Sequence, residues 1–112
     1  MFANLADPIT TEGTRPMPTI RFEPLPREYG EWALPTSGRV RVDELSWPSS
    51  RGYAVTGEPA ALRALAGQLD ALARHLLEAA MSGPGDGANL RVRARWHQRQ
   101  AVRLRAVLDR AA

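Results

Sequence analysis

The stretch GEPAALRALAGQLDALARHLLEAA, residues 57–80, predicts a long amphipathic helix that organises the rest of the chain. Glu58 and Pro59 suit a helix start, because an acid complements the positive end of the helix dipole and proline fits the first turn. Leucines then recur at alternating three- and four-residue steps, the spacing of a core-facing stripe: Leu62, Leu65, Leu69, Leu72 and Leu76. Ala66, Ala73 and Leu77 make this stripe broader than the narrow seam of a coiled-coil dimer, which is the alternative. We therefore expect the helix to pack on a sheet.

The residues before this helix predict strands, because seven of the nine prolines fall within the first 48 residues and disfavour helices there. Ile20 and Phe22 alternate with polar neighbours, and the prolines at 24 and 26 place this strand at a sheet edge or end it. Residues 31–34 and 40–43 read as a hairpin around the turn at 35–38. The alternation then changes phase, which indicates a bulge near Asp43–Glu44 or a strand covered on both faces. Residues 48–52 predict a turn, and residues 53–56 predict a short strand.

The last part of the chain, NLRVRARWHQRQAVRLRAVLDR at 89–110, divides into two predicted elements. Apolar residues at 90, 92, 94 and 96 alternate with Arg91, Arg93 and Arg95, which predicts a half-buried strand with a row of arginines on its wet face. After His97 the apolar residues follow a helical period, with Arg99 and Arg103 on another face. The predicted fold class is therefore α+β: a small antiparallel sheet of 4–5 strands packed by one long amphipathic helix, with a basic C-terminal helix. Residues 1–17 are expected to be a flexible N-terminal arm, and residues 18–112 a single α+β domain.

Composition restricts the classes of function. The chain has 112 residues and no cysteine, which excludes disulfides, thiolate zinc sites and cysteine nucleophiles. Its apolar runs are far shorter than the ~20 residues of a membrane span, and its first residues lack the basic start and apolar centre of a signal peptide. We therefore expect a cytoplasmic protein without a membrane partner.

Charge is distributed unevenly along the chain. Residues 1–88 carry eight Arg against eleven acids, a balance of −3, whereas residues 89–112 carry seven Arg against one acid, a balance of +6. Such asymmetry indicates an acidic partner. Every basic residue is Arg and none is Lys, so part of this signal reflects a general preference for Arg. The planar guanidinium still suits carboxylate and phosphate recognition.

The candidate partner-binding residues are the cations of this basic end and the aromatic side chain beside them: Arg91, Arg93, Arg95, Arg99, Arg103 and Trp96. They predict contact with an acidic protein surface. The alternative is a nucleic acid, because arginines along a strand repeat at about 6–7 Å and Trp96 could stack on a base. Self-association is left open.

Catalytic signals are weak. His75 and His97 have no second His or acid at a metal-binding helical spacing. The glycine-rich residues 83–87 lie between a predicted helix and a predicted strand, whereas a phosphate loop needs the reverse order, from a strand into a helix. We therefore expect no catalytic residue, no metal site, no cofactor and no enzymatic activity.

One segment resembles a known family. Residues 52–92 contain a short strand, a Gly-x-Pro entry to a Leu/Ala helix, and a second predicted strand, with these matching positions: Val55, Thr56, Gly57, Pro59, Leu62, Leu65, Ala66, Leu69 and Ala73. This pattern is similar to that of small bacterial immunity proteins of polymorphic toxin systems. The His-containing closing strand of that family is replaced here by RVRAR, and the Arg-rich final helix is an addition. The resemblance implies a non-enzymatic protein that binds another protein, and it assigns no site residue.

Overall fold

The computed structural model describes residues 17–30, 38–83, 85 and 87–111. Its elements are β1 (Thr19–Arg21), β2 (Leu25–Pro26), the 3-10 helix η2 (Arg27–Tyr29), β3 (Val40–Ser46), β4 (Ser50–Gly57), α2 (Pro59–Ser82) and α3 (Gly87–Ala111). All strand pairs are antiparallel. The predicted α+β class is confirmed, and the described sheet has four strands where 4–5 were predicted. Two helices of similar length pack beside this sheet, instead of one long helix and a shorter one.

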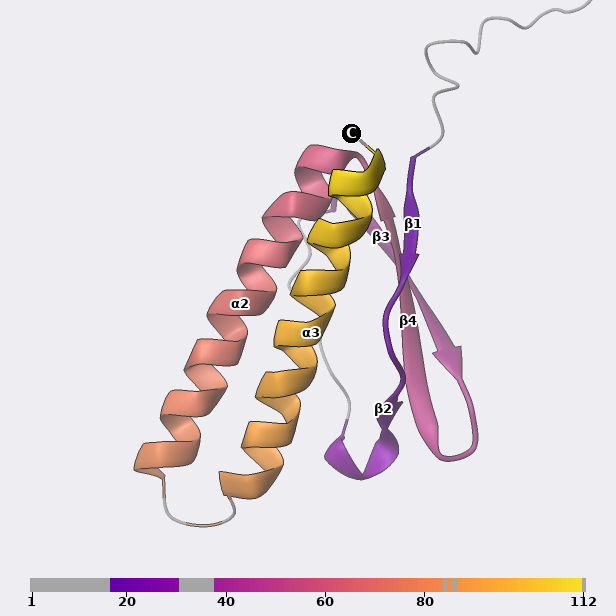
Figure 1. Cartoon of the computed structure of the whole chain (residues 1–112). Helices are drawn as coiled ribbons and strands as arrows, with labels where there is room; N and C mark the ends of the chain where they lie inside the picture. The colour runs from indigo at the N-terminus through magenta and orange to yellow at the C-terminus, as the bar shows by residue number, and fades with distance from the viewer. Residues whose placement is uncertain (1–16, 31–37, 84, 86, 112) are drawn as a thin grey trace, which may run out of the picture.

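β4 is the central strand of the sheet (Figure 1). β3 pairs with one edge of β4, while β1 and β2 follow one another along its other edge. Arg21 pairs with Ala54, and Leu25 pairs with Arg51. The edge therefore advances by four positions between these two pairs, whereas β4 advances by three. The extra residue forms a bulge at residues 23–24, where Pro24 removes a backbone donor that a regular strand would need. The predicted edge strand is thus confirmed, and the bulge lies within this edge.

The predicted bulge near Asp43–Glu44 is wrong. β3 pairs with β4 without interruption from Val40 opposite Gly57 to Ser46 opposite Arg51. The change of phase has another cause: apolar residues switch from one sheet face to the other along the strand. Val40 is buried toward the helices, whereas Trp47 packs over Gly52 on the opposite face. The observed hairpin joins β3 to β4, and the predicted partner strand at 31–34 lies outside the described residues, as does nearly all of the predicted arm at 1–17.

α2 forms as the leucine spacing predicts. Leu62, Leu65, Leu69 and Leu76 are buried, together with the alanines of the broad stripe. Both helices cover the same face of the sheet and run antiparallel to one another (Figure 1). The main core lies between this helix pair and the strands, and a smaller cluster around Ala73 and Ala94 continues between the helices. The leucine stripe is therefore occupied within the chain and is not a dimer seam.

Residues 90–96 are the main correction to the sequence interpretation, because they belong to α3 and not to a strand. The buried residues of α3 follow helical three- and four-residue steps: Ala94, His97, Ala101, Leu104 and Leu108, with Trp96 and Gln100 beside them. Two of these buried residues, His97 and Gln100, are polar, so the hydrophobic pattern conceals the helical period. Arg, Ala, Leu and Gln also favour helices intrinsically.

Among the described residues, no helix is long and apolar enough to cross a membrane.

Candidate partner-binding surface

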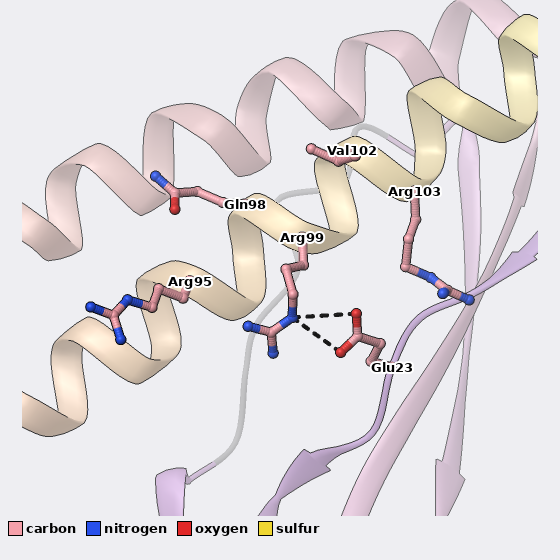
Figure 2. A pocket seen from close by; sticks show the side chains of 6 residues that line it. All are labelled: Glu23, Arg95, Gln98, Arg99, Val102 and Arg103. Carbon is pink, nitrogen blue, oxygen red and sulfur yellow. Dashed lines mark hydrogen bonds and ion pairs between the residues drawn. The ribbon is translucent and has the colours of Figure 1, made fainter.

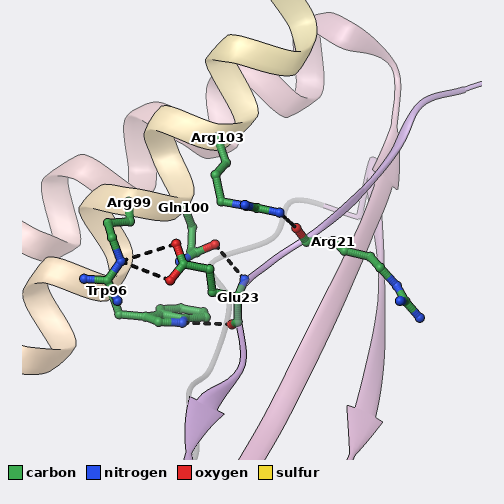
Figure 3. Close-up of polar contacts among 6 residues, drawn as sticks. All are labelled: Arg21, Glu23, Trp96, Arg99, Gln100 and Arg103. Atoms are coloured by element: carbon green, nitrogen blue, oxygen red, sulfur yellow. Dashed lines mark hydrogen bonds and ion pairs between the residues drawn. The ribbon is translucent and has the colours of Figure 1, made fainter.

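α3 is attached to the bulged edge of the sheet by two buried side chains. The Trp96 indole Nε1–H donates to the backbone carbonyl of Glu23 at 2.9 Å, and the backbone N–H of Glu23 donates to Gln100 Oε1, also at 2.9 Å (Figure 3). A bulge leaves its extra residue without a ladder partner, and an unpaired polar group in a partly buried position costs about 1–3 kcal/mol. Trp96 and Gln100 therefore complete the hydrogen bonds of this edge from outside the sheet.

Two arginines reinforce the attachment at the surface. Arg99 Nε lies 3.1 Å from Glu23 Oε1, and Arg103 Nη2 donates to the backbone carbonyl of Arg21 at 2.9 Å (Figure 3). On the other side of α3, ion pairs join Arg105 to Asp70 and Arg63 to Asp109 across the two helices. Helix α3 is thus fixed on both sides, and its remaining face is turned to solvent.

That solvent-facing side carries a line of four cations, which we name the α3 ridge: Arg91, Arg95, Arg99 and Arg103. Residues four apart lie on the same side of a helix, and each step advances about 6 Å along its axis. All four side chains are exposed. Arg91 and Arg95 form no ion pair or hydrogen bond with another described residue, whereas Arg99 and Arg103 are held by the β1–β2 edge. The ridge therefore has two anchored cations and two that are available for a partner.

A shallow groove runs beside the ridge where α3 meets the bulge (Figure 2). It is lined by Arg95, Arg99 and Arg103 of the ridge and by Glu23, Gln98 and Val102. Val102 is 62% exposed. Val102 lines the same groove as Arg95, Arg99 and Arg103, so a partner could place an apolar group on Val102 while the cations bind its carboxylates.

The structure separates the six predicted binding residues into two groups. Arg91, Arg95, Arg99 and Arg103 are brought together on the ridge. Arg93 is half-buried with its Nε shielded from solvent, because the odd-numbered arginines that share one face of a strand diverge on a helix. Trp96 leaves the predicted surface altogether: it is 1% exposed and packs edge-on against Phe22 and Tyr53.

Sequence reasoning missed three members of the groove, which are Glu23, Gln98 and Val102. Gln98 and Val102 would have been found if residues 90–96 had been assigned to the helix, because positions 91, 95, 98 and 102 share one helical face. Glu23 is 76 residues from Arg99 in the sequence. Its place beside the ridge follows only from the docking of α3 on the bulge.

His97 is the buried histidine of the chain, and its environment explains its state. Burial lowers the pKa of the imidazole below its ordinary value of 6.5, a hydrogen bond to the Arg93 carbonyl acts in the opposite direction, and the Arg93 charge lowers the pKa further. The Nδ1 atom lies 2.5 Å from that carbonyl, which can only accept, so Nδ1 carries the proton of the neutral ring. Among the described residues, no three His, Cys, Asp or Glu side chains are grouped to hold a metal ion. His97 is best explained as part of the core.

Comparisons of the chain with protein-family models, curated proteins and solved structures found no match. The function proposed below therefore rests on the geometry and charge of the α3 ridge and its groove.

Proposed function

We propose that this protein is a non-enzymatic protein-binding module that uses the α3 ridge to bind an acidic surface of a protein partner. The observation that carries this proposal is the alignment of Arg91, Arg95, Arg99 and Arg103 along one exposed helical face beside an exposed Val102. Roles as an immunity-like protein, an adaptor or an assembly component all require binding of this kind. The resemblance to immunity proteins extends only over β4 and the start of α2, because the closing strand expected at residues 90–92 is part of α3.

The charge of the surface favours carboxylate ligands. Within the part of the chain that the structure describes, one acid, Glu23, forms an ion pair with the ridge, and it neutralises part of the Arg99 charge. Guanidinium groups bind carboxylates through two parallel hydrogen bonds, and these bonds strengthen when partner contact removes water. Arg91 and Arg95 would lose no ion pair with another described residue on binding. They are therefore the residues expected to contribute most to affinity.

The groove specifies the partner more closely than charge alone. A carboxylate-rich helix or extended segment with one apolar side chain could place that side chain on Val102 and its acids against the ridge on either side. Hot spots of protein interfaces combine such an apolar contact with arginine anchors. We therefore expect an acidic segment that also carries an apolar residue, not a uniformly charged polyanion.

The alternative is a nucleic-acid-binding accessory protein that uses the same arginines. The axial step of about 6 Å between ridge residues is compatible with phosphate spacing. However, the stacking platform expected from Trp96 is buried in the core, and base stacking supplies much of the affinity for single strands. The protein partner is therefore the better supported reading.

The test is affinity capture from the source cell, followed by measurement of the dissociation constant for the recovered partner. The double variant Arg91→Glu/Arg95→Glu should weaken binding by about tenfold or more, because two attractive charge contacts become repulsive. The matched control is Arg74→Glu on the exposed side of α2, which should bind as the wild type does. Equal affinity of the double variant and the control would refute the proposal.

A second measurement separates the two classes of partner. Fluorescence anisotropy with single- and double-stranded oligonucleotides at low salt should detect no binding. Binding whose logarithm falls steeply and linearly with the logarithm of salt concentration would instead establish the nucleic-acid alternative.

A further inference from the structure

The outer edge of β3 has backbone groups that face away from the sheet. Antiparallel residue pairs alternate between those that share backbone hydrogen bonds and those whose groups point outward. Tyr53 of β4 accepts a hydrogen bond from Phe22 of the β1 side at 2.8 Å. Tyr53 and Val55 therefore point toward β1, and their partners in β3, Glu44 and Val42, direct their N–H and C=O groups away from β4.

This edge lacks three of the devices that protect natural edge strands against pairing, namely a proline, a bulge and, among the described residues, a covering segment. Its protection is limited to charged side chains, those of Arg41, Asp43 and Glu44. β3, with the sequence VRVDELS, has no proline, and its pairing with β4 is continuous. Among the described residues, none donates to or accepts from the outward groups of Val42 or Glu44. The opposite edge differs sharply, because there α3 side chains bind the outward groups of Arg21 and Glu23.

We propose that β3 is a self-association edge on which a second copy of the chain adds its own β3 in antiparallel orientation. When two copies of β3 pair, backbone hydrogen bonds form only if the residues whose N–H and C=O groups point away from β4, such as Val42 and Glu44, face one another. The register centred on Val42 satisfies this condition, with Val42 opposite Val42 of the second copy. It also places Arg41 of each copy opposite Asp43 of the other.

Charge complementarity selects this register. Arg41 and Asp43 lie on the same face of β3, and within one chain Arg41 Nη2 is 3.1 Å from Asp43 Oδ2. In the dimer each would gain a second partner of opposite charge across the two strands, at a pair position where side chains approach most closely. If the numbers of the paired residues sum to two more than in this register, Asp43 faces Asp43, and if they sum to two fewer, Arg41 faces Arg41. Both alternatives place like charges in direct opposition.

The other exposed surfaces favour β3 as the self-association site. The α3 ridge would repel its own copy, since it is a line of four cations. Self-association through β3 leaves the ridge uncovered, because the ridge lies beside the β1–β2 edge on the other side of β4. This inference is therefore independent of the proposed function, and each can fail without the other.

The experiment is sedimentation velocity on the full chain up to millimolar concentration, with two charge reversals. Arg41→Asp places two acids opposite each other at both contacts, and Asp43→Arg places two arginines there, so each variant alone should dimerise at least about tenfold more weakly than the wild type. An equimolar mixture of the two variants restores an Asp–Arg pair at both contacts. The mixture should therefore form a heterodimer of about wild-type affinity.

A backbone variant tests the edge independently of charge. Glu44→Pro removes an outward N–H that does not pair with β4, so it should abolish the dimer while the melting temperature stays close to that of the wild type. Asp43→Pro is the control, because it removes an N–H that points to β4 and should lower the melting temperature strongly.

Each outcome bears on the proposal. Dimerisation of the wild type, its loss in the single variants and its recovery in their mixture would establish it. A wild type that stays monomeric, a dimer that persists in Glu44→Pro, or a mixture that fails to associate would overturn it.

Discussion

Replacement of Trp96 by alanine tests whether α3 is docked on the sheet as described. The indole is 1% exposed, contacts the rings of Phe22 and Tyr53 edge-on, and donates a 2.9 Å hydrogen bond to the Glu23 carbonyl. Removal of a buried Trp side chain costs about 3–5 kcal/mol. The unpaired carbonyl at the bulge places the expected loss in the upper part of this range.

A loss of about 4 kcal/mol in a domain of this size corresponds to a decrease in Tm of roughly 15–30 °C. Thermal unfolding followed by circular dichroism measures this shift directly. Trp47→Ala is the matched control, because Trp47 is 41% exposed and lies over Gly52 on the open face of the sheet. Its loss should be about 1 kcal/mol. If Trp96→Ala changes the stability by less than about 0.5 kcal/mol, as surface substitutions do, the docking of α3 is wrong.

Three further predictions follow from the surroundings of α3. Burial lowers the pKa of His97, so below about pH 6.5 the unfolded chain binds more protons than the folded one, and the free energy of unfolding should fall as pH decreases. Arg93→Glu should destabilise the fold by about 1–3 kcal/mol because its site is half-buried, whereas Arg95→Glu at an exposed site should change stability little. Glu23→Gln should cost less than about 1 kcal/mol, since its ion pair with Arg99 is at the surface. It should also strengthen partner binding, because Arg99 is released and the ridge becomes more positive.

Each of these predictions has a control and a contrary result. His97→Asn should flatten the stability profile between pH 5 and 6.5, whereas substitution of the exposed His75 should leave it unchanged. If the free energy of unfolding of His97→Asn depends on pH as that of the wild type does, the buried neutral state of the His97 imidazole is contradicted. Equal melting temperatures for Arg93→Glu and Arg95→Glu would indicate that the two residues lie on one common face, as in the predicted strand. Weaker partner binding by Glu23→Gln would show that Glu23 itself contacts the partner.

The parts of the fold that could be predicted are those in which the polarity of each residue matches its burial. The leucines of residues 62–76 are apolar and face the core, so their spacing alone defines α2. The prolines at 24 and 26 placed their strand at an edge, and the structure uses Pro24 in the bulge. Both inferences depend on local chemistry that neighbouring elements do not alter.

The strand predicted at 90–96 failed for an equally specific reason. The residues that continue the helical stripe of α3 beyond Ala94 are His97 and Gln100, which are polar yet 0% exposed. Gln100 is buried because its Oε1 accepts a hydrogen bond from the backbone N–H of Glu23 in the bulge. Glu23 lies 77 residues away in the sequence. A local pattern cannot contain this information. Four of the candidate arginines lie on the α3 ridge, and their alignment could be recognised only from the helix.

The most direct test of the α3 ridge as the partner-binding surface is site-specific photo-crosslinking to the captured partner. A photoreactive residue at Val102 lies at the centre of the groove, and one at Gln68 occupies an exposed position on α2. The position at 102 should form a crosslink with the partner that disappears in the Arg91→Glu/Arg95→Glu background, and the position at 68 should form none. A crosslink from 68 and none from 102 would show that the partner binds elsewhere on the molecule.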